Sequence, residues 1–308
     1  MPLDDATTAF IAQVSQARPR PLTEMAPDEV RLGTARLRAL YGTGPGMQRT
    51  EDVRVGEGEH AFDVRVLVPN QAPSGVILYF HGGGWVTGDI DDFDVLGRKV
   101  AERTGCAVLL VNYRLAPEHR FPAAVNDACA ALHWADANIE AIAGRQVPLV
   151  LLGDSAGGNL AAVAAHRARD AGLSVAMQVL LYPVTDSDFN RPTYTDPKNQ
   201  LLLNRASMVW FWDHYLPDAC MRLQPDASPL RSTNFQVLPP TLILTAEFDP
   251  LREEGEAYAA KLVAAGVPVE FERYAGQMHG FFSMVNVLPG SERAINHVAR
   301  FIRERLSR

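Results

Sequence analysis

The feature that most constrains the fold of this chain is an alternation between short apolar runs and longer alanine-rich runs. Runs rich in β-branched residues are expected to be strands, at 62–68, 75–80, 107–111, 148–152, 177–182, 241–246 and 267–273. The longer runs are expected to be helices, at 92–103, 123–137, 157–171, 253–265 and 291–306. Several strands are unbroken apolar strings, which is typical of parallel strands buried on both faces, whereas 62–68 alternates like an antiparallel edge strand. The pattern therefore predicts an α/β fold with helices covering a mostly parallel sheet.

Two regions depart from this alternation. Residues 1–50 contain helix-like segments without an expected strand, and they include a glycine-rich stretch at 42–46. Residues 183–235 are rich in proline and polar residues, and they hold one aromatic helix candidate at 206–215. A connection of this length within a compact domain is uncommon unless it is functional, for instance as a lid. We therefore expect both regions to be additions to one sheet domain.

Composition excludes several classes of protein. The chain has 308 residues, 47% hydrophobic and 21% charged, which is ordinary for a globular protein with a large core. Its net charge of −7 argues against nucleic acid or anionic lipid as the main partner. Cys106, Cys129 and Cys220 lack Cys-x-x-Cys spacing, which argues against a disulfide framework or a cysteine zinc site. Without a membrane-spanning stretch, and with Asp4 and Asp5 where a signal peptide would be basic, the chain is expected to be cytoplasmic.

The segment Gly153-Asp-Ser-Ala-Gly157 follows an expected strand and opens an expected helix. It fits the G-x-S-x-G pattern of a nucleophile elbow, a sharp turn that lifts a serine hydroxyl above the sheet. The flanking glycines let neighbouring backbone approach the turn. The alternative is an ordinary helix start with a capping serine. The context favours Ser155 as a nucleophile, with Asp154 as a supporting residue.

A second motif, His81-Gly-Gly-Gly-Trp85, follows directly on the expected strand at 75–80. Consecutive glycines are costly to order, so a loop that contains them needs their backbone conformation. Such a loop can aim N–H groups at the oxyanion that develops during acyl transfer. A phosphate loop is the alternative, but the chain lacks the G-x-x-x-x-G-K-[ST] pattern. Together with the serine elbow, the loop predicts an acyl-transfer enzyme.

The catalytic base is expected to be a histidine late in the chain, because nucleophile-elbow enzymes order their residues as Ser, then Asp or Glu, then His. His279 and His297 are the histidines that follow the last acid candidates. His279 stands in a loop after the final expected strand, whereas His297 falls within the final expected helix. We therefore favour His279.

The acid is expected just beyond the strand at 241–246, where both Glu247 and Asp249 stand. Either carboxylate could orient an imidazole, and periodicity does not separate the two. Asp186 and Asp188, after the preceding strand, are less favoured candidates.

Taken together, these motifs resemble those of the hormone-sensitive-lipase-like carboxylesterases, the bacterial family IV branch of the α/β-hydrolase superfamily. The matching segments are His81-Gly-Gly-Gly-Trp85, Gly153-Asp-Ser-Ala-Gly-Gly158, Asp249-Pro-Leu251 with Met278-His-Gly280, and Tyr113-Arg-Leu-Ala-Pro-Glu118 continuing to Phe121-Pro-Ala-Ala124 and Asp127. The resemblance extends in order and spacing from about residue 55 to residue 308. It implies an α/β-hydrolase fold, with a mostly parallel central sheet flanked by helices and a helical cap.

The resemblance also implies roles for individual residues. It makes Ser155 the nucleophile, His279 the general base and acid, and Asp249 the orienting carboxylate, because the family's acid stands in Asp-Pro-Leu. His81 would brace its loop and would not act as a base. The oxyanion hole would be formed by the backbone N–H groups of Gly83, Gly84 and Ala156.

A cap is implied by the same resemblance, built discontinuously from residues 1–50 and about 185–230 of one domain spanning 1–308. The aromatic helix candidate and the glycine-rich loop would then supply walls of the substrate pocket. The candidate wall residues are Trp85, Met208, Trp210, Phe211 and Trp212. The alternative for these side chains is ordinary helix packing.

The expected function is a serine carboxylesterase that hydrolyses short- to medium-chain acyl esters of small molecules through an acyl-enzyme, without metal or cofactor. One alternative is an amidase or deacetylase that uses the same triad. Another is a non-catalytic ligand-binding receptor on the same fold, which the retained serine, acid, histidine and glycine-rich loop argue against. The protein is expected to be a monomer or a homodimer, and dimers through the last strand and helix occur in the family that it resembles.

Overall fold

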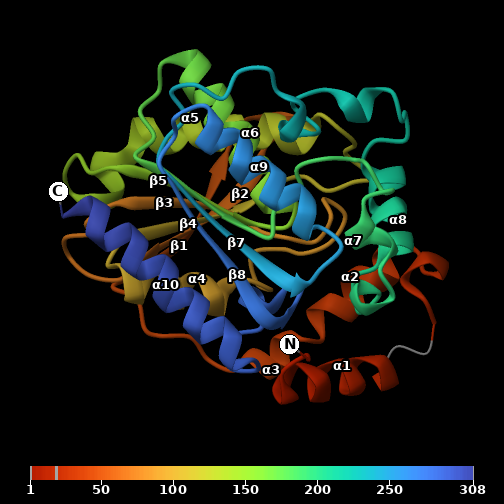
Figure 1. The fold of residues 1–308 in the computed structure, drawn as a ribbon. Helices are drawn as coiled ribbons and strands as arrows, with labels where there is room; N and C mark the ends of the chain where they lie inside the picture. Colours follow the sequence, from red (N-terminus) through yellow and green to blue (C-terminus); the bar gives the residue numbers. More distant parts are fainter. Residues whose placement is uncertain (1, 18–19, 308) are drawn as a thin grey trace.

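A computed structural model describes residues 2–17 and 20–307, and it shows a central eight-stranded sheet covered by helices (Figure 1). The strands are β1 (Arg49–Val55), β2 (Phe62–Val68), β3 (Val76–Phe80), β4 (Ala107–Asn112), β5 (Leu149–Asp154), β6 (Met177–Leu181), β7 (Thr241–Phe248) and β8 (Val269–Met278). They lie in the order β1-β2-β4-β3-β5-β6-β7-β8. The pairs β1–β2 and β2–β4 are antiparallel and the others are parallel, which confirms the predicted α/β architecture.

Helices cover both faces of the sheet. The α-helices are α1 (Asp5–Ala17), α2 (Pro27–Ala35), α3 (Arg38–Tyr41), α4 (Asp94–Thr104), α5 (Ala123–Ala143), α6 (Ala156–Ala171), α7 (Pro192–Thr195), α8 (Arg205–Tyr215), α9 (Arg252–Ala264) and α10 (Pro289–Leu306). Helices α4 and α10 pack together on one face, and α5, α6 and α9 cover the other (Figure 1). None of the helices within the described residues is long and apolar enough to cross a bilayer.

The central strands are apolar throughout because both of their faces are buried. In β3, Ile77 and Tyr79 point into the core beneath α4 and α10, whereas Leu78 and Phe80 point into the core beneath α5 and α6. This is the alternation of side chains that a strand imposes. Each large apolar side chain buried in this way contributes about 1.5–3 kcal/mol to folding.

Strand β1 was not expected. It forms the edge of the sheet, a position that was predicted for β2. Strand β2 is antiparallel, as its alternation predicted, but it lies between β1 and β4. Strand β1 has little apolar signal because Val55 is its single buried residue. Its attachment is partly ionic: Asp52 accepts two hydrogen bonds, of 2.8 and 2.9 Å, from Arg65 of β2.

The two regions outside the strand–helix alternation meet at one end of the sheet. Helices α1, α2, α7 and α8 lie on the side where the arrows of β7 and β8 end (Figure 1). Helix α8 contacts the short 3₁₀ turn Leu22–Glu24 between α1 and α2. The carboxyl ends of the parallel strands therefore face segments that are far apart in the sequence.

Candidate active site

Ser155 occupies the sharp turn between β5 and α6. Its φ is 55° and its ψ is −119°, a combination that residues other than glycine rarely adopt. A Cβ atom on Gly153 would overlap the carbonyl of Gly157, and one on Gly157 would overlap the carbonyl of Phe80. The glycines on either side of the serine are therefore required by the close approach of three backbone segments.

The residues predicted as nucleophile, base and acid stand beyond the ends of β5, β8 and β7, and they form one hydrogen-bonded line. Ser155 Oγ lies 2.9 Å from His279 Nε2, and His279 Nδ1 lies 2.8 Å from Asp249 Oδ2. Asp249 is fully buried, and its other oxygen accepts a 2.8 Å hydrogen bond from the N–H of Leu251. With its proton on Nδ1, the imidazole donates to the carboxylate and accepts from the serine hydroxyl.

The structure places Asp249, and not Glu247, beside His279. Glu247 Oε2 instead accepts a 2.7 Å hydrogen bond from the N–H of Gly276, and this bond is the main reason that the pKa of Glu247 is lowered. Neither acid candidate after β6 contacts the histidine. Asp186 binds the guanidinium groups of Arg191 and Arg231. Asp188 accepts a hydrogen bond of 3.0 Å from the N–H of Asn190.

His297, the second histidine considered as the base, lies on α10 with Nε2 2.7 Å from Glu270. It is thus paired with a carboxylate of β8 and takes no part in the line that ends at Ser155. Among the described residues, His, Cys, Asp and Glu side chains form no group of three that could hold a metal ion.

The glycine loop, residues 81–88, is attached to the serine turn through Asp154. Asp154 Oδ1 accepts hydrogen bonds of 2.9 Å from the N–H of Gly82 and 2.7 Å from the hydroxyl of Tyr79. The loop begins with His81, whose ring stacks on Tyr113 at 4.4 Å between centroids. Burial lowers the pKa of His81 to about 4, so its imidazole is neutral near pH 7. This aromatic packing gives His81 a bracing position.

Two residues of the glycine loop contact aromatic side chains of α8. A Cβ atom on Gly84 would overlap the ring of Phe211, so Phe211 lies directly against the loop backbone. Trp85 is fully buried and stacks on Tyr215, with centroids 4.2 Å apart and planes 7° apart. Helix α8 therefore packs on the loop as well as on its own neighbours.

A cavity of about 200 Å³ opens beside Ser155 and His279. Its wall includes Met208 and Phe211, whereas Trp85, Trp210 and Trp212 do not line it. These three tryptophans are at least nine-tenths buried, and Trp212 packs edge-on against Trp85, so they pack within the core beside the cavity. Apolar residues of α1, α2 and the segments beside them also line the cavity, and no sequence motif marks them. They include Phe10, Val14, Leu22 and Val30.

The buried carboxyl of Asp154 predicts a pH-dependent stability. Burial raises its pKa from 3.8 to about 6, so between these values the folded protein keeps a proton that the unfolded chain has released. The free energy of unfolding therefore falls as pH rises through this window, by about 3 kcal/mol in total. Asp154→Asn has no such proton and retains an acceptor for Gly82. We expect the free energy of unfolding of this variant, measured in urea and taken relative to that of the unmodified protein, to rise from pH 4 to pH 6. Parallel plots of the two free energies against pH would contradict this.

Comparisons with known proteins agree with this architecture. A family model described as alpha/beta hydrolase fold matches residues 77–283. Carboxylesterase NlhH of Mycobacterium tuberculosis is 37% identical over 284 residues, 89% of each chain, and an ethyl acetate hydrolase of Pseudomonas putida is 35% identical over 253 residues, 80% of each chain. The structure of a hyperthermophilic esterase from the archaeon Pyrobaculum calidifontis superposes with a TM-score of 0.91, at 35% identity and 99% coverage of both chains. The chain therefore belongs to the alpha/beta hydrolase family, among its hormone-sensitive-lipase-like carboxylesterases, and it is a carboxylic ester hydrolase.

Proposed function

We propose that the protein hydrolyses short- to medium-chain acyl esters by two-step acyl transfer, with Ser155 as nucleophile, His279 as base and Asp249 as orienting carboxylate. The observation that carries this proposal is the unbroken hydrogen-bonded line from Asp249 through His279 to Ser155. A weak nucleophile such as a hydroxyl needs an adjacent base, and the base needs a partner that fixes its tautomer.

In the first step, Ser155 Oγ attacks the ester carbonyl while its proton passes to His279 Nε2. The C–O bond to the alcohol then breaks, and His279 returns that proton to the leaving alkoxide. Asp249 stabilises the imidazolium that forms between these events. Water, deprotonated by His279, attacks the acyl-enzyme in the same way and releases the acid.

The developing oxyanion is assigned to the backbone N–H groups of Gly83, Gly84 and Ala156. The N–H of Gly82 is already bonded to Asp154, which supports the choice of the two later glycines. Ala156 is the first residue of α6, where the helix dipole also favours negative charge. Loss of one such donor typically reduces turnover by about 100- to 1,000-fold.

Residues 1–50 and about 185–230 are proposed to act as one discontinuous cap on a single hydrolase domain. The cavity wall supports this, because Phe10 and Val14 come from the first segment and Met208 and Phe211 from the second. Both segments also meet where α8 contacts the turn Leu22–Glu24. The substrate pocket then has its catalytic floor on the sheet and its apolar walls on the cap.

A burst experiment tests the proposed chemistry. Mixing the protein with a p-nitrophenyl ester is expected to release one equivalent of p-nitrophenol per active site before the steady state, if deacylation is slower than acylation. A serine-directed phosphonate should abolish turnover and label Ser155, as shown by peptide mass mapping. Labelling at another residue, or turnover that survives stoichiometric labelling, would contradict the proposal.

Cavity size leads to a prediction about chain length. Pockets for drug-sized ligands measure about 300–1,000 Å³, and the cavity here holds about 200 Å³. With p-nitrophenyl esters from acetyl to hexadecanoyl, kcat/KM is therefore expected to peak at a short or medium chain. Because each buried methylene contributes about 0.8 kcal/mol, the gain per methylene should cease once the cavity is full. A maximum at hexadecanoyl would refute this preference.

A further inference from the structure

The backbone of the glycine loop requires support from its surroundings. Four of its residues have positive φ: Gly83 at 119°, Gly84 at 61°, Trp85 at 59° and Gly88 at 91°. The glycines adopt these angles without steric strain but are costly to order, whereas the positive φ of the non-glycine Trp85 persists only where neighbouring structure determines it. The contacts that hold the loop therefore decide where the N–H groups of Gly83 and Gly84 point.

Part of this support comes from the sheet domain. Asp154 holds the first glycine, and the carbonyl of Gly83 accepts the N–H of Thr87 at 2.9 Å. The carbonyl of Trp85 accepts the N–H of Ala116 at 2.8 Å. These bonds fix the start of the loop and join its middle to the segment after β4.

Arg31 of α2 provides a second attachment, from the N-terminal helices. Its Nε donates to the carbonyl of Val86 at 2.9 Å, and its Nη2 donates to the carbonyl of Ala116 at 2.9 Å. The carboxylate of Glu118 holds the same guanidinium with bonds of 2.6 and 3.0 Å. The planar guanidinium of Arg31 thus bonds both the loop and the segment after β4 that supports it. A lysine ammonium would not reproduce this set of bonds.

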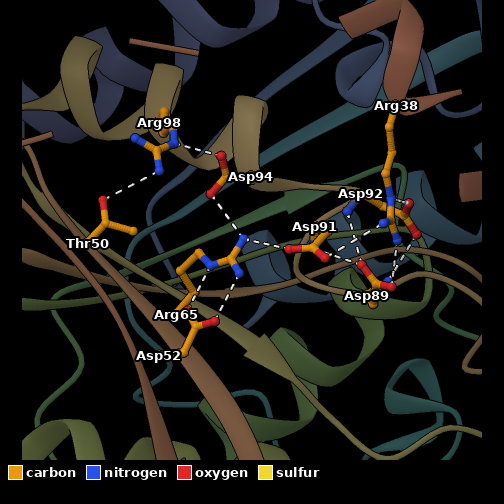
Figure 2. Close-up of polar contacts among 9 residues, drawn as sticks. All are labelled: Arg38, Thr50, Asp52, Arg65, Asp89, Asp91, Asp92, Asp94 and Arg98. Atoms are coloured by element: carbon orange, nitrogen blue, oxygen red, sulfur yellow. Dashed lines mark hydrogen bonds and ion pairs between the residues drawn. The ribbon is translucent and has the colours of Figure 1, made fainter. Parts of the chain in front are cut away.

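Arg38 of α3 provides a third attachment, just beyond the loop (Figure 2). Its Nη2 donates to Asp89 Oδ2 at 2.6 Å, and its Nε donates to Asp92 Oδ1 at 2.5 Å. Asp89 Oδ1 also accepts the N–H of Asp92, while Asp92 Oδ2 accepts the N–H of Asp89, so the turn closes on itself. Two carboxylates this close repel each other unless a cation lies between them, and Arg38 supplies it.

The turn at residues 89–92 is also bound to the sheet. Arg65 of β2 donates to Asp91 at 2.8 Å and to Asp94 at 3.2 Å (Figure 2). Asp92 lines the cavity, so the turn is part of the active-site wall. The N-terminal helices therefore hold the chain on both sides of Thr87 and Gly88, through Arg31 before them and Arg38 after them.

We infer that Arg31 and Arg38 are positioning residues for the oxyanion donors, so that helices α2 and α3 set the catalytic rate as well as the shape of the pocket. The inference rests on the proposed function of Gly83 and Gly84. Displacing these donors costs less than removing one, and a small misplacement of catalytic groups still slows a reaction about 10- to 100-fold. Arg31 carries the larger effect because it bonds the loop backbone itself, at the carbonyl of the buried Val86, whereas Arg38 bonds side chains beyond the loop, and its partner Asp89 is partly exposed.

The test compares Arg31→Gln, Arg31→Lys and Arg38→Gln with Arg20→Gln as a matched control. Arg20 also belongs to the N-terminal segment, but it pairs with Glu29, and both side chains are about half exposed. For each variant, kcat and KM are measured with the best p-nitrophenyl ester, together with inhibition by a trifluoromethyl ketone. That ketone mimics the tetrahedral intermediate: Ser155 Oγ bonds to its carbonyl carbon, the oxygen takes the electron pair, and the proton passes to His279.

Arg31→Gln is expected to lower kcat about 10- to 100-fold, to weaken ketone binding by a similar factor and to leave KM within about 3-fold. Arg31→Lys should recover only part of this loss. Arg38→Gln should lower kcat by less, and the difference from the unmodified enzyme should shrink in about 1 M NaCl, which screens exposed ion pairs. Arg20→Gln should match the unmodified enzyme.

Unchanged ketone affinity in Arg31→Gln and Arg38→Gln, or a rise in KM alone, would overturn the inference, because the arginines would then only shape the pocket. An equal loss in Arg20→Gln would also overturn it. If Arg31→Gln fails to fold in a thermal melt, Arg31→Lys and Arg38→Gln provide the same comparison. Failure of the proposed function is distinct: the unmodified protein itself would then show neither a burst nor labelling at Ser155.

Discussion

Replacing Ser155 by alanine is expected to reduce ester turnover by roughly a million-fold, to the level of the substrate's background reaction in the same cavity. Without Oγ there is no atom for the ester carbonyl to acylate, and His279 has no hydroxyl to deprotonate. The fold should survive, because alanine retains the Cβ that the turn already accommodates at a φ of 55°. Substrate binding should therefore remain while chemistry stops.

The measurement is kcat for a p-nitrophenyl ester, together with binding of a non-hydrolysable analogue such as the matching ether, which, unlike a ketone, forms no bond to Ser155. Ser74→Ala is a suitable control, because Ser74 stands just before the start of β3, at the opposite end of the strand from the glycine loop, and bonds to the carbonyl of Gly105. This control should keep full activity. Retention of more than about one per cent of the rate in Ser155→Ala would exclude Ser155 as the nucleophile.

Asp249→Asn should have the next largest effect, with kcat falling by about 10⁴-fold. The asparagine oxygen can keep the bond from the N–H of Leu251, but its amide would then face His279 with a donor in place of an acceptor. The imidazole would move its proton to Nε2 and could no longer accept from Ser155. Glu247→Gln should lose at most a few-fold, because Glu247 serves the N–H of Gly276.

Comparing the two variants assigns the acid directly. Both remove one negative charge from the same segment at the end of β7, so a shared effect of charge cancels in the comparison. Rates of phosphonate labelling should follow the same order as kcat, because labelling also requires an activated Ser155. A greater loss in Glu247→Gln, or equal losses in both variants, would remove Asp249 from its proposed role.

The sheet and the serine turn could be predicted because their physical requirements are local. Strands buried on both faces need unbroken apolar runs, and the turn at Ser155 needs glycines where three backbone segments converge. Strand β1 carries no such requirement, since hydrogen bonding to β2 and ion pairs hold it. Its sequence therefore resembles a loop.

The acid could not be chosen from the pattern for a geometric reason. Glu247 and Asp249 are two residues apart, so a continuing strand would point both side chains to the same face. The pairing of β7 with β8 shifts register between Ala246 and Phe248, which breaks the alternation at this place. The direction of each carboxylate depends on the chain after the strand, and no local signal encodes it.

The cavity wall was predicted only in outline. The aromatic residues of α8 were expected to line it, but a helix buries side chains on several sides, and here Trp210 and Trp212 pack away from the cavity while Met208 and Phe211 face it. The contributions of Phe10 and Val14 depend on where α1 docks. Docking is a long-range property that the sequence of α1 does not specify by itself.

The docking of α1 affects the order in which the parts of the protein assemble during synthesis. Asp4 accepts a hydrogen bond from Gln277, which stands 273 positions later in the sequence. It also donates its N–H to the carbonyl of Gly276 at 3.1 Å. A ribosome delivers α1 first, yet its partner emerges near the end of synthesis. We therefore expect helix α1 to wait undocked while the sheet assembles. The pocket then closes last, and a nascent chain stalled before β8 would carry a nearly finished sheet but no enclosed site.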